Sequence, residues 1–258
     1  MEKKGPWSSC QRRQQVDFSL FIDRFITSKE GGADKRIQIN TISDETGIEK
    51  RRLYDLMNVL CAFGVCNKTD IHRYVWTSMN QINISLLEIA KSVEKNATKA
   101  QTFNNLFVLP ESPSVGCLAT TIASIFIFFG SHVMNIHDIS LFLSNKQSEK
   151  QLLRRLYLVT YMLEKIKILR HGSRIGEYEI TCDVRKLSKM AFEELANKGE
   201  FPPDSIEFQL NRFTDDFLDR MHNNRFYEFN VLIQVSRKRK GDYQPSPNFK
   251  EALLFAEI

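Results

Sequence analysis

The chain has 258 residues, of which 42% are hydrophobic and 26% are charged, and its formal net charge is +5. This composition is ordinary for a folded protein and excludes a disordered or low-complexity chain. Five scattered cysteines do not form a disulfide framework, and they indicate a reducing compartment. The N-terminus has no apolar stretch, and the longest apolar run, 122–129, is far shorter than the ~20 residues of a membrane span. We therefore expect neither a signal peptide nor a membrane partner.

The basic excess is concentrated in two stretches. Residues 1–79 and residues 114–182 each carry a net charge of +3, and the charges of the remaining residues nearly cancel. An excess of this size is compatible with binding to nucleic acid but does not establish it.

The first stretch predicts the element order of a winged helix. An apolar stripe over 18–26 predicts a helix that the paired glycines after residue 30 interrupt. Alternation over 36–39 predicts a short strand, which leads into a short helix over 41–46. A longer helix is expected over 48–63, and two strands are expected in 65–76 around a polar tip at residues 68–70. A helix, a strand, two helices and a hairpin are typical of this helix-turn-helix variant.

Residues 114–182 repeat the plan. We expect a first helix over 118–129, a short second helix that Asn135 caps, and a third helix that begins with a capping box at Ser148 and Gln151. A hairpin over 168–180 follows. The letters RRLY at 51–54 recur at 154–157, an offset of 103 residues, which predicts two copies of one module.

These patterns together predict a mainly α fold with small β-hairpins (α+β). We expect a basic tail (1–15), a first winged-helix domain (16–79) and a helical linker (80–113) with a helix near 84–100. A diverged second domain (114–182) and a C-terminal extension (183–258) follow. Within the extension we expect helices near 188–197 and 205–222 and a strand over 226–235. The sequence assigns no chemistry to it.

The candidate binding residues lie at the start of the third helix of the first domain. Arg51 and Arg52 are adjacent in its first turn, and guanidinium groups match the O6 and N7 acceptors of guanine in the major groove. Asp55 lies one turn further on and can hold a guanidinium in one rotamer. Tyr54 and Asn58 are candidate phosphate contacts. Spacing alone fits a solvated helix face with an ordinary ion pair equally well.

The string from Arg51 to Leu60 resembles the DNA-binding signature of the E2F/DP transcription factors, R-R-x-Y-D-x-x-N-V-L, with all seven fixed positions present. The similarity extends over about residues 16–78. It implies that the two arginines read G·C steps of a TTTSSCGC-type promoter element and that Lys50 and Tyr54 contact phosphates. It also implies a nuclear, cell-cycle-type regulator of transcription that binds double-stranded DNA, without enzymatic activity, cofactor or small-molecule substrate.

Typical family members form heterodimers in which each partner supplies one winged helix, whereas atypical members carry two in tandem. This chain resembles the atypical arrangement, and a heterodimer or homodimer partner from the family stays open. Arg154, Arg155 and Tyr157 are the corresponding candidate DNA contacts, although the acid, amide and valine of the signature are replaced. The capping box places this arginine pair roughly three residues deeper in its helix, about 4–5 Å along the axis. The second copy therefore reads bases weakly, grips the backbone only, or serves as a dimer-like surface.

Three further features bear on function. No acidic, aromatic-rich activation segment follows the second domain, which favours repression or competition for sites over activation. The pair Cys61 and Cys66 with His72 lacks the other ligands of a zinc site, and we expect buried cysteines that act as small apolar side chains. The basic run 237–240 fits either a nuclear-import signal or a basic patch at a strand end. The alternative to a DNA reader is a winged-helix scaffold or subunit of a nuclear complex, with little sequence-specific DNA binding of its own.

Overall fold

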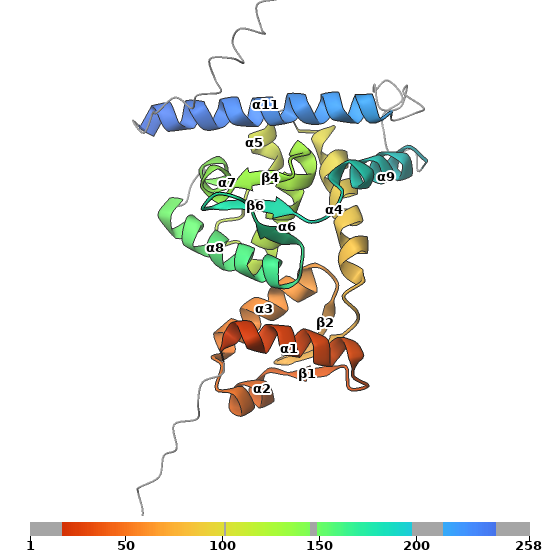
Figure 1. Cartoon of the computed structure of the whole chain (residues 1–258), viewed down its shortest axis with the longest axis vertical. Coiled ribbons are helices and arrows are strands. Elements are labelled where there is room, and N and C mark those ends of the chain that lie inside the picture. Colours follow the sequence, from red (N-terminus) through yellow and green to blue (C-terminus); the bar gives the residue numbers. More distant parts are fainter. Residues whose placement is uncertain (1–16, 101, 145–148, 198–213, 241–258) are drawn as a thin grey trace, which may run out of the picture.

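The structure, a computed structural model, describes residues 17–100, 102–144, 149–197 and 214–240. Two units of similar topology are stacked along the long axis of the molecule, and helices from the linker and the C-terminal region cover the second unit (Figure 1). The first unit lies at the bottom of this view, and the C-terminal helix crosses the top.

The first unit has the predicted order of elements, namely α1 (Phe18–Gly31), β1 (Arg36–Gln38), α2 (Ile39–Thr46), α3 (Lys50–Ala62), β2 (Cys66–Asp70) and β3 (Arg73–Trp76). Asp17 caps α1, because its carboxylate accepts hydrogen bonds from the amides of Ser19 and Leu20. Gly47 ends α2 in the left-handed conformation, with a φ of 71°. The strands form an antiparallel sheet in the order β1-β3-β2.

The hairpin of this unit turns later than the sequence predicts. Residues 68–70, expected to be the tip, belong to the edge strand β2, and the turn lies at Ile71 and His72. His72 takes a φ of 66° there. The polarity of 68–70 therefore reflects the solvent exposure of an edge strand and not a turn. The wing is longer than predicted, and a histidine lies at its tip.

The second unit repeats this topology with α6 (Val115–Phe129), β4 (Val133–Asn135), α7 (Ile136–Leu143), α8 (Glu149–Lys165), β5 (Leu169–His171) and β6 (Glu177–Ile180). Its sheet order, β4-β6-β5, corresponds to that of the first unit. Asn135 caps α7 as predicted, since its side chain accepts the amide hydrogen of His137 at 2.9 Å. The strand β4 was not predicted, and Ser148 of the expected capping box lies outside the described residues.

The linker contains α4 (Gln81–Ala97) and α5 (Phe103–Leu106), and the C-terminal region contains α9 (Val184–Asn197) and α11 (Asp215–Lys240). The predicted strand over 226–235 is wrong, because these residues belong to α11. Phe229 and Ile233, one helical turn apart, are buried, and the Phe229 ring lies 4.9 Å from that of Phe129. Packing of this face on α6 overrides the β propensity of the local sequence. Of the helix expected over 205–222, the structure describes 215–222 as helical and does not describe residues 205–213.

The two units pack against each other through corresponding helices, with α3 against α6 and α1 against α8. Each unit thus offers its first and third helices to the third and first helices of the other, as in the interface of a two-fold dimer. A Cβ at Gly116 would lie 2.6 Å from the carbonyl oxygen of Asn58, so only glycine permits this approach of α6 to α3. Lys165 of α8 also forms an ion pair with Asp23 of α1 at 3.0 Å.

A buried ion pair fastens the C-terminal helix to the linker. The Arg225 guanidinium on α11 donates two hydrogen bonds to the Glu94 carboxylate on α4, at 2.7 and 2.8 Å. The same guanidinium lies 3.9 Å from the centre of the Phe128 ring and donates to the Phe128 carbonyl. Glu94 is only 2% exposed. The linker and the C-terminal region therefore form one layer over the second unit.

Candidate nucleic-acid interface

The start of α3 presents basic side chains to solvent. The helix buries one face, so that its polar residues point away from the core; the buried residues are Leu53, Leu56, Met57, Val59 and Leu60. Lys50 and Arg51 are exposed in the first turn, where the sequence predicts them. A helix N-terminus with unpaired amides and basic side chains is suited to phosphate and base edges.

Asp55 holds one of the two arginines. Its carboxylate accepts a hydrogen bond from Arg52 at 3.0 Å, and the Arg52 side chain remains 39% exposed. Burial raises the pKa of Asp55 above its ordinary range, against the opposing effect of the charges on Arg52, Arg51 and Arg155. The structure thus brings Asp55 together with Arg52, while the Arg51 side chain extends from an exposed position.

The wing, the hairpin of β2 and β3, is joined to α3 by a contact that the sequence did not indicate. The Tyr54 hydroxyl and the Nδ1 atom of His72, at the wing tip, form a hydrogen bond. The two residues are 18 positions apart, and only the folding of the hairpin brings them together. Tyr54, predicted to contact phosphate, therefore also positions the wing. Asn58, although exposed, lies where α3 meets the second unit.

The second arginine pair lies in different surroundings. In α8 the arginines are the sixth and seventh residues, whereas in α3 they are the second and third. Counted within the described part of each helix, the pair lies four residues later in α8, about 6 Å along the axis, and so lies deeper in its helix, as predicted. Arg154 is exposed, but Arg155 is half-buried and donates to the backbone carbonyl of Pro113. Tyr157 is 37% exposed and bonds to Nε2 of His137 on α7 at 3.1 Å.

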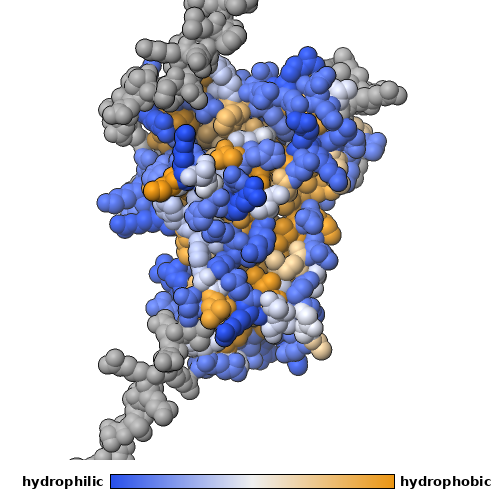
Figure 2. All heavy atoms as spheres, viewed as in Figure 1, coloured by the Kyte–Doolittle hydropathy of each residue, from blue (hydrophilic) through white to orange (hydrophobic). Residues whose placement is uncertain are grey.

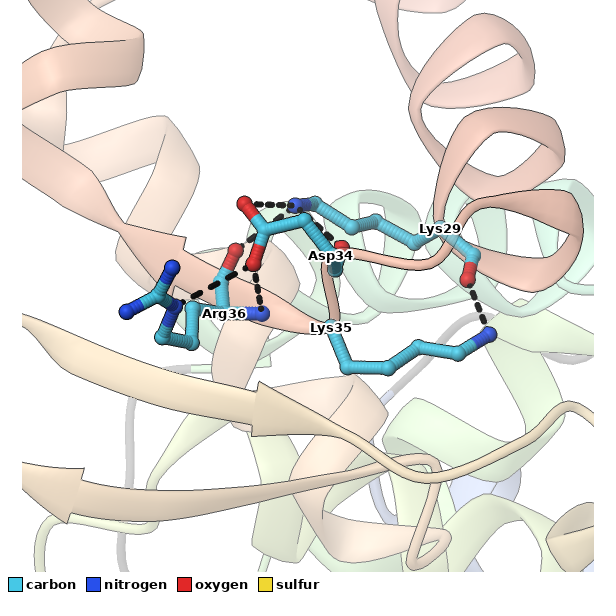
Figure 3. Close-up of polar contacts among 4 residues, drawn as sticks. All are labelled: Lys29, Asp34, Lys35 and Arg36. Carbon is cyan, nitrogen blue, oxygen red and sulfur yellow. Dashed lines mark hydrogen bonds and ion pairs between the residues drawn. The ribbon is translucent and has the colours of Figure 1, made fainter.

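A polar cluster shapes the turn between α1 and β1 (Figure 3). The Lys29 ammonium donates to the carbonyls of Asp34 and Arg36, at 3.0 and 2.6 Å, and the Lys35 ammonium donates to the carbonyl of Lys29 at 2.7 Å. The Arg36 amide, followed by its side chain, lowers the pKa of Asp34. The cluster borders a cleft of about 910 Å³ between α1, α2 and the sheet. None of the predicted DNA contacts lines this cleft, so we assign the cluster to the support of β1.

The described residues were compared with the requirements of two other classes of site, a metal site and a membrane span, and meet neither. That part of the chain holds no group of three or more His, Cys, Asp or Glu side chains placed to bind a metal ion. None of the helices in 17–100, 102–144, 149–197 and 214–240 is both long and apolar enough to cross a membrane. Figure 2 shows a mostly hydrophilic face, with apolar side chains gathered near the level at which the lower unit meets the upper one.

Comparison with known proteins bears on the first unit. Residues 18–78 match the E2F/DP family winged-helix DNA-binding domain. The first unit is a winged-helix domain of E2F/DP type. The match runs from the first residue of α1 to two residues beyond β3, so it covers the whole unit and no part of the linker.

Curated relatives are similar to part of the chain at low identity. E2F transcription factor-like E2FE from Arabidopsis thaliana is 25% identical over 96 residues, which are 37% of this chain and 23% of the relative. Transcription factor E2F8 from Bos taurus is 29% identical over 73 residues, 28% of this chain and 8% of the relative. Transcription factor efl-3 from Caenorhabditis elegans is 26% identical over 74 residues, 27% of this chain and 12% of the relative. The chain thus spans less than a quarter of the length of these relatives.

Proposed function

We propose that this chain is a nuclear, non-enzymatic regulator of transcription that recognises double-stranded DNA through α3. The observation that carries the proposal is the arginine pair in the first turn of α3, with Arg51 exposed and Arg52 half-buried against Asp55, inside a domain of E2F/DP type. In this proposal the two guanidinium groups read G·C steps of a TTTSSCGC-like element in the major groove. Lys50 and Tyr54 fix the register on phosphates, and Asp55 keeps the Arg52 fork in one orientation.

We further propose that residues 114–182 are a second winged-helix domain, which gives one chain the role of a dimer. The repeated element order and sheet order support this assignment, as does the packing of α3 on α6 and of α1 on α8. Arg154 and Tyr157 are then the DNA contacts of the second domain. Arg155 is in contact with Pro113 and would serve the packing of the units more than the reading of bases. The proposal also includes a heterodimer or homodimer with a partner protein from the same family.

We infer that the regulator acts by repression or by competition for sites, since occupation of the element by the two units is enough to exclude other proteins from it. The alternative function is that of a scaffold in a nuclear complex. A groove of about 500 Å³ between the end of α4, α5 and α11 favours it, since the lining is largely apolar and includes Phe103, Leu106 and Leu232. Val108 and Tyr227, 66% and 50% exposed, lie in the same linker and C-terminal regions.

Fluorescence anisotropy across a salt series tests the proposal, with a TTTCCCGCC duplex and a scrambled duplex of equal composition. We expect a preference of at least about 10³-fold for the first duplex, and its loss in the variant Arg51→Ala/Arg52→Ala. The matched control, Lys186→Ala/Arg220→Ala, removes the same charge from exposed positions on α9 and α11 and should retain the preference. Equal, weak binding of both duplexes by the wild-type chain, unchanged in the α3 variant, would refute base reading and favour the scaffold.

A further inference from the structure

Two free thiols meet where the recognition helix passes into the wing. The Sγ atoms of Cys61, in the last turn of α3, and Cys66, the first residue of β2, are 3.1 Å apart. Both cysteines are reduced in the structure. Neither thiol has a part in the DNA-reading face proposed above.

The backbone brings the two thiols together. Gly64 takes a φ of 68°, and the chain reverses so that the Val65 amide donates to the Leu60 carbonyl at 2.9 Å. This left-handed ending of the helix folds β2 back onto the last turn of α3. The thiol pair is therefore held by a fixed turn.

The two cysteines differ in access and in acidity. Cys61 is half-buried, whereas the Cys66 side chain is completely buried, with Sγ 3.9 Å from the carbonyl oxygen of Met57. The hydrogen bond from Cys66 lowers the pKa of Cys61, and the amide and the ammonium of Lys68 lower it further against the effect of burial. The hydrogen bond with Cys61, together with burial, raises the pKa of Cys66. Cys61, the thiol that solvent can reach, is therefore the one more readily deprotonated to a thiolate.

We propose that Cys61 and Cys66 form an oxidation site for hydroperoxides, in which Cys61 is the attacking thiol and Cys66 the resolving thiol. An accessible thiol beside a second, resolving thiol is the arrangement of a reversible redox site.

The chemistry balances with a hydroperoxide as the oxidant. The Cys61 thiolate attacks one peroxide oxygen, the O–O bond breaks, and the departing oxygen takes up a proton and leaves as water or an alcohol. Cys61 is then a sulfenic acid. The Cys66 sulfur attacks the Cys61 sulfur, the S–O bond breaks, and hydroxide leaves as water with the Cys66 proton. Two thiols are oxidised to one disulfide, and the peroxide is reduced by two electrons. The sulfurs need approach by only about 1 Å to reach the disulfide distance.

Peptide mapping of the full chain after graded exposure to hydrogen peroxide tests the site. The tryptic peptide 53–68 contains both cysteines, so a disulfide lowers its mass by two hydrogens. We expect this loss in the wild-type chain, its reversal by dithiothreitol, and no change at Cys182, whose pKa burial raises to about 11. Oxidation of Cys61 should be at least about tenfold faster than that of Cys182. Equal rates at the two cysteines, or a peptide 53–68 that keeps both hydrogens, would overturn the proposal.

Two variants separate the roles of the thiols. In Cys66→Ser the sulfenic acid on Cys61 has no resolving partner, so dimedone should trap it. In Cys61→Ser the buried Cys66 should remain a thiol and yield no dimedone adduct. Cys117→Ser, which alters a half-buried cysteine on α6, is the matched control and should form the disulfide as the wild type does. Dimedone labelling of Cys66 in Cys61→Ser would refute the assignment of roles. Peptide mapping of the wild-type chain alone decides whether the disulfide forms, whether or not either serine variant folds.

Discussion

Replacing Arg225 by alanine should weaken the helical layer over the second unit. The guanidinium is 15% exposed and supplies both hydrogen bonds to a Glu94 carboxylate that is 2% exposed, so its removal leaves a buried charge without a partner. Breaking a buried pair in this way costs about 3–5 kcal/mol. The lost contact with the face of Phe128 accounts for about 1–2 kcal/mol of that total.

Equilibrium urea unfolding, followed by far-ultraviolet circular dichroism, measures this loss. We expect the effects of the two substitutions to be non-additive, because the cost comes from the unpaired Glu94 carboxylate and not from the missing Arg225 side chain. We therefore expect Glu94→Leu/Arg225→Met, which replaces both charges by apolar groups, to lose less than about 2 kcal/mol. A cost below about 1 kcal/mol for Arg225→Ala, or losses of Glu94→Leu and of Arg225→Met that simply add in the double variant, would refute a strongly coupled buried pair.

Three further perturbations address the unit interface, acid stability and the second arginine pair. Gly116→Ala places a Cβ 2.6 Å from an α3 backbone oxygen and should lower the free energy of unfolding by about 1–3 kcal/mol, whereas Gly31→Ala meets nothing within 4 Å and should be near neutral in urea unfolding. Burial lowers the pKa of His222 from 6.5 to about 4, so the unfolded chain takes up the proton at a higher pH than the folded chain. The free energy of unfolding should therefore fall by roughly 3 kcal/mol as the pH drops from 6.5 to 4. In His222→Gln, urea unfolding should show a smaller fall. Arg154→Ala should weaken DNA binding in anisotropy without loss of stability, while Arg155→Ala, which frees a backbone carbonyl, should cost about 1–2 kcal/mol of stability.

Each of these expectations has an outcome that contradicts it. Equal stabilities of the two glycine variants would mean that α6 and α3 do not approach closely. If the loss of stability at low pH persisted in His222→Gln, or disappeared in the exposed-site variant His171→Gln, a group other than His222 would be responsible for it. A loss of stability in Arg154→Ala, together with a loss of DNA affinity alone in Arg155→Ala, would reverse the roles given to the two arginines.

The sequence predicted the helices of both units because their signals are local. Apolar stripes, the left-handed glycines at positions 47 and 130, and the asparagine cap at 135 each act within a few residues, and the structure has each of these features. The strand β4 was missed because Val133 and Met134 are adjacent apolar residues and give no alternation, whereas the equally short β1 alternates. In α11 the local run of aromatic and β-branched residues favoured a strand, and only contacts with α6 and α7 select the helix.

In the candidate site, as in the fold, the sequence predicted the contacts within one helix and missed the contacts between elements. The spacing of Arg52 and Asp55 on one helix predicted an ion pair, which the structure contains. The contacts of Tyr54 with His72 and of Arg155 with Pro113 join residues 18 and 42 positions apart. No periodicity connects such pairs, because the wing and the approach of the linker to α8 bring them together. The roles of these side chains therefore required the tertiary structure.

The asymmetry between the two arginine pairs follows from one difference in sequence. Three residues after Arg52 the chain has Asp55, and three residues after Arg155 it has Leu158, a half-buried residue packed against the core. Arg155 therefore lacks the acid that Arg52 has one turn further along its helix. Its guanidinium turns to the Pro113 carbonyl, where it also lies close enough to Asp55 of the first unit to affect the pKa of that carboxyl. With Leu158 where α3 has an acid, α8 thus places a cation at the junction between the units. Through this contact the second unit can stabilise the orientation of α3 without contacting DNA itself.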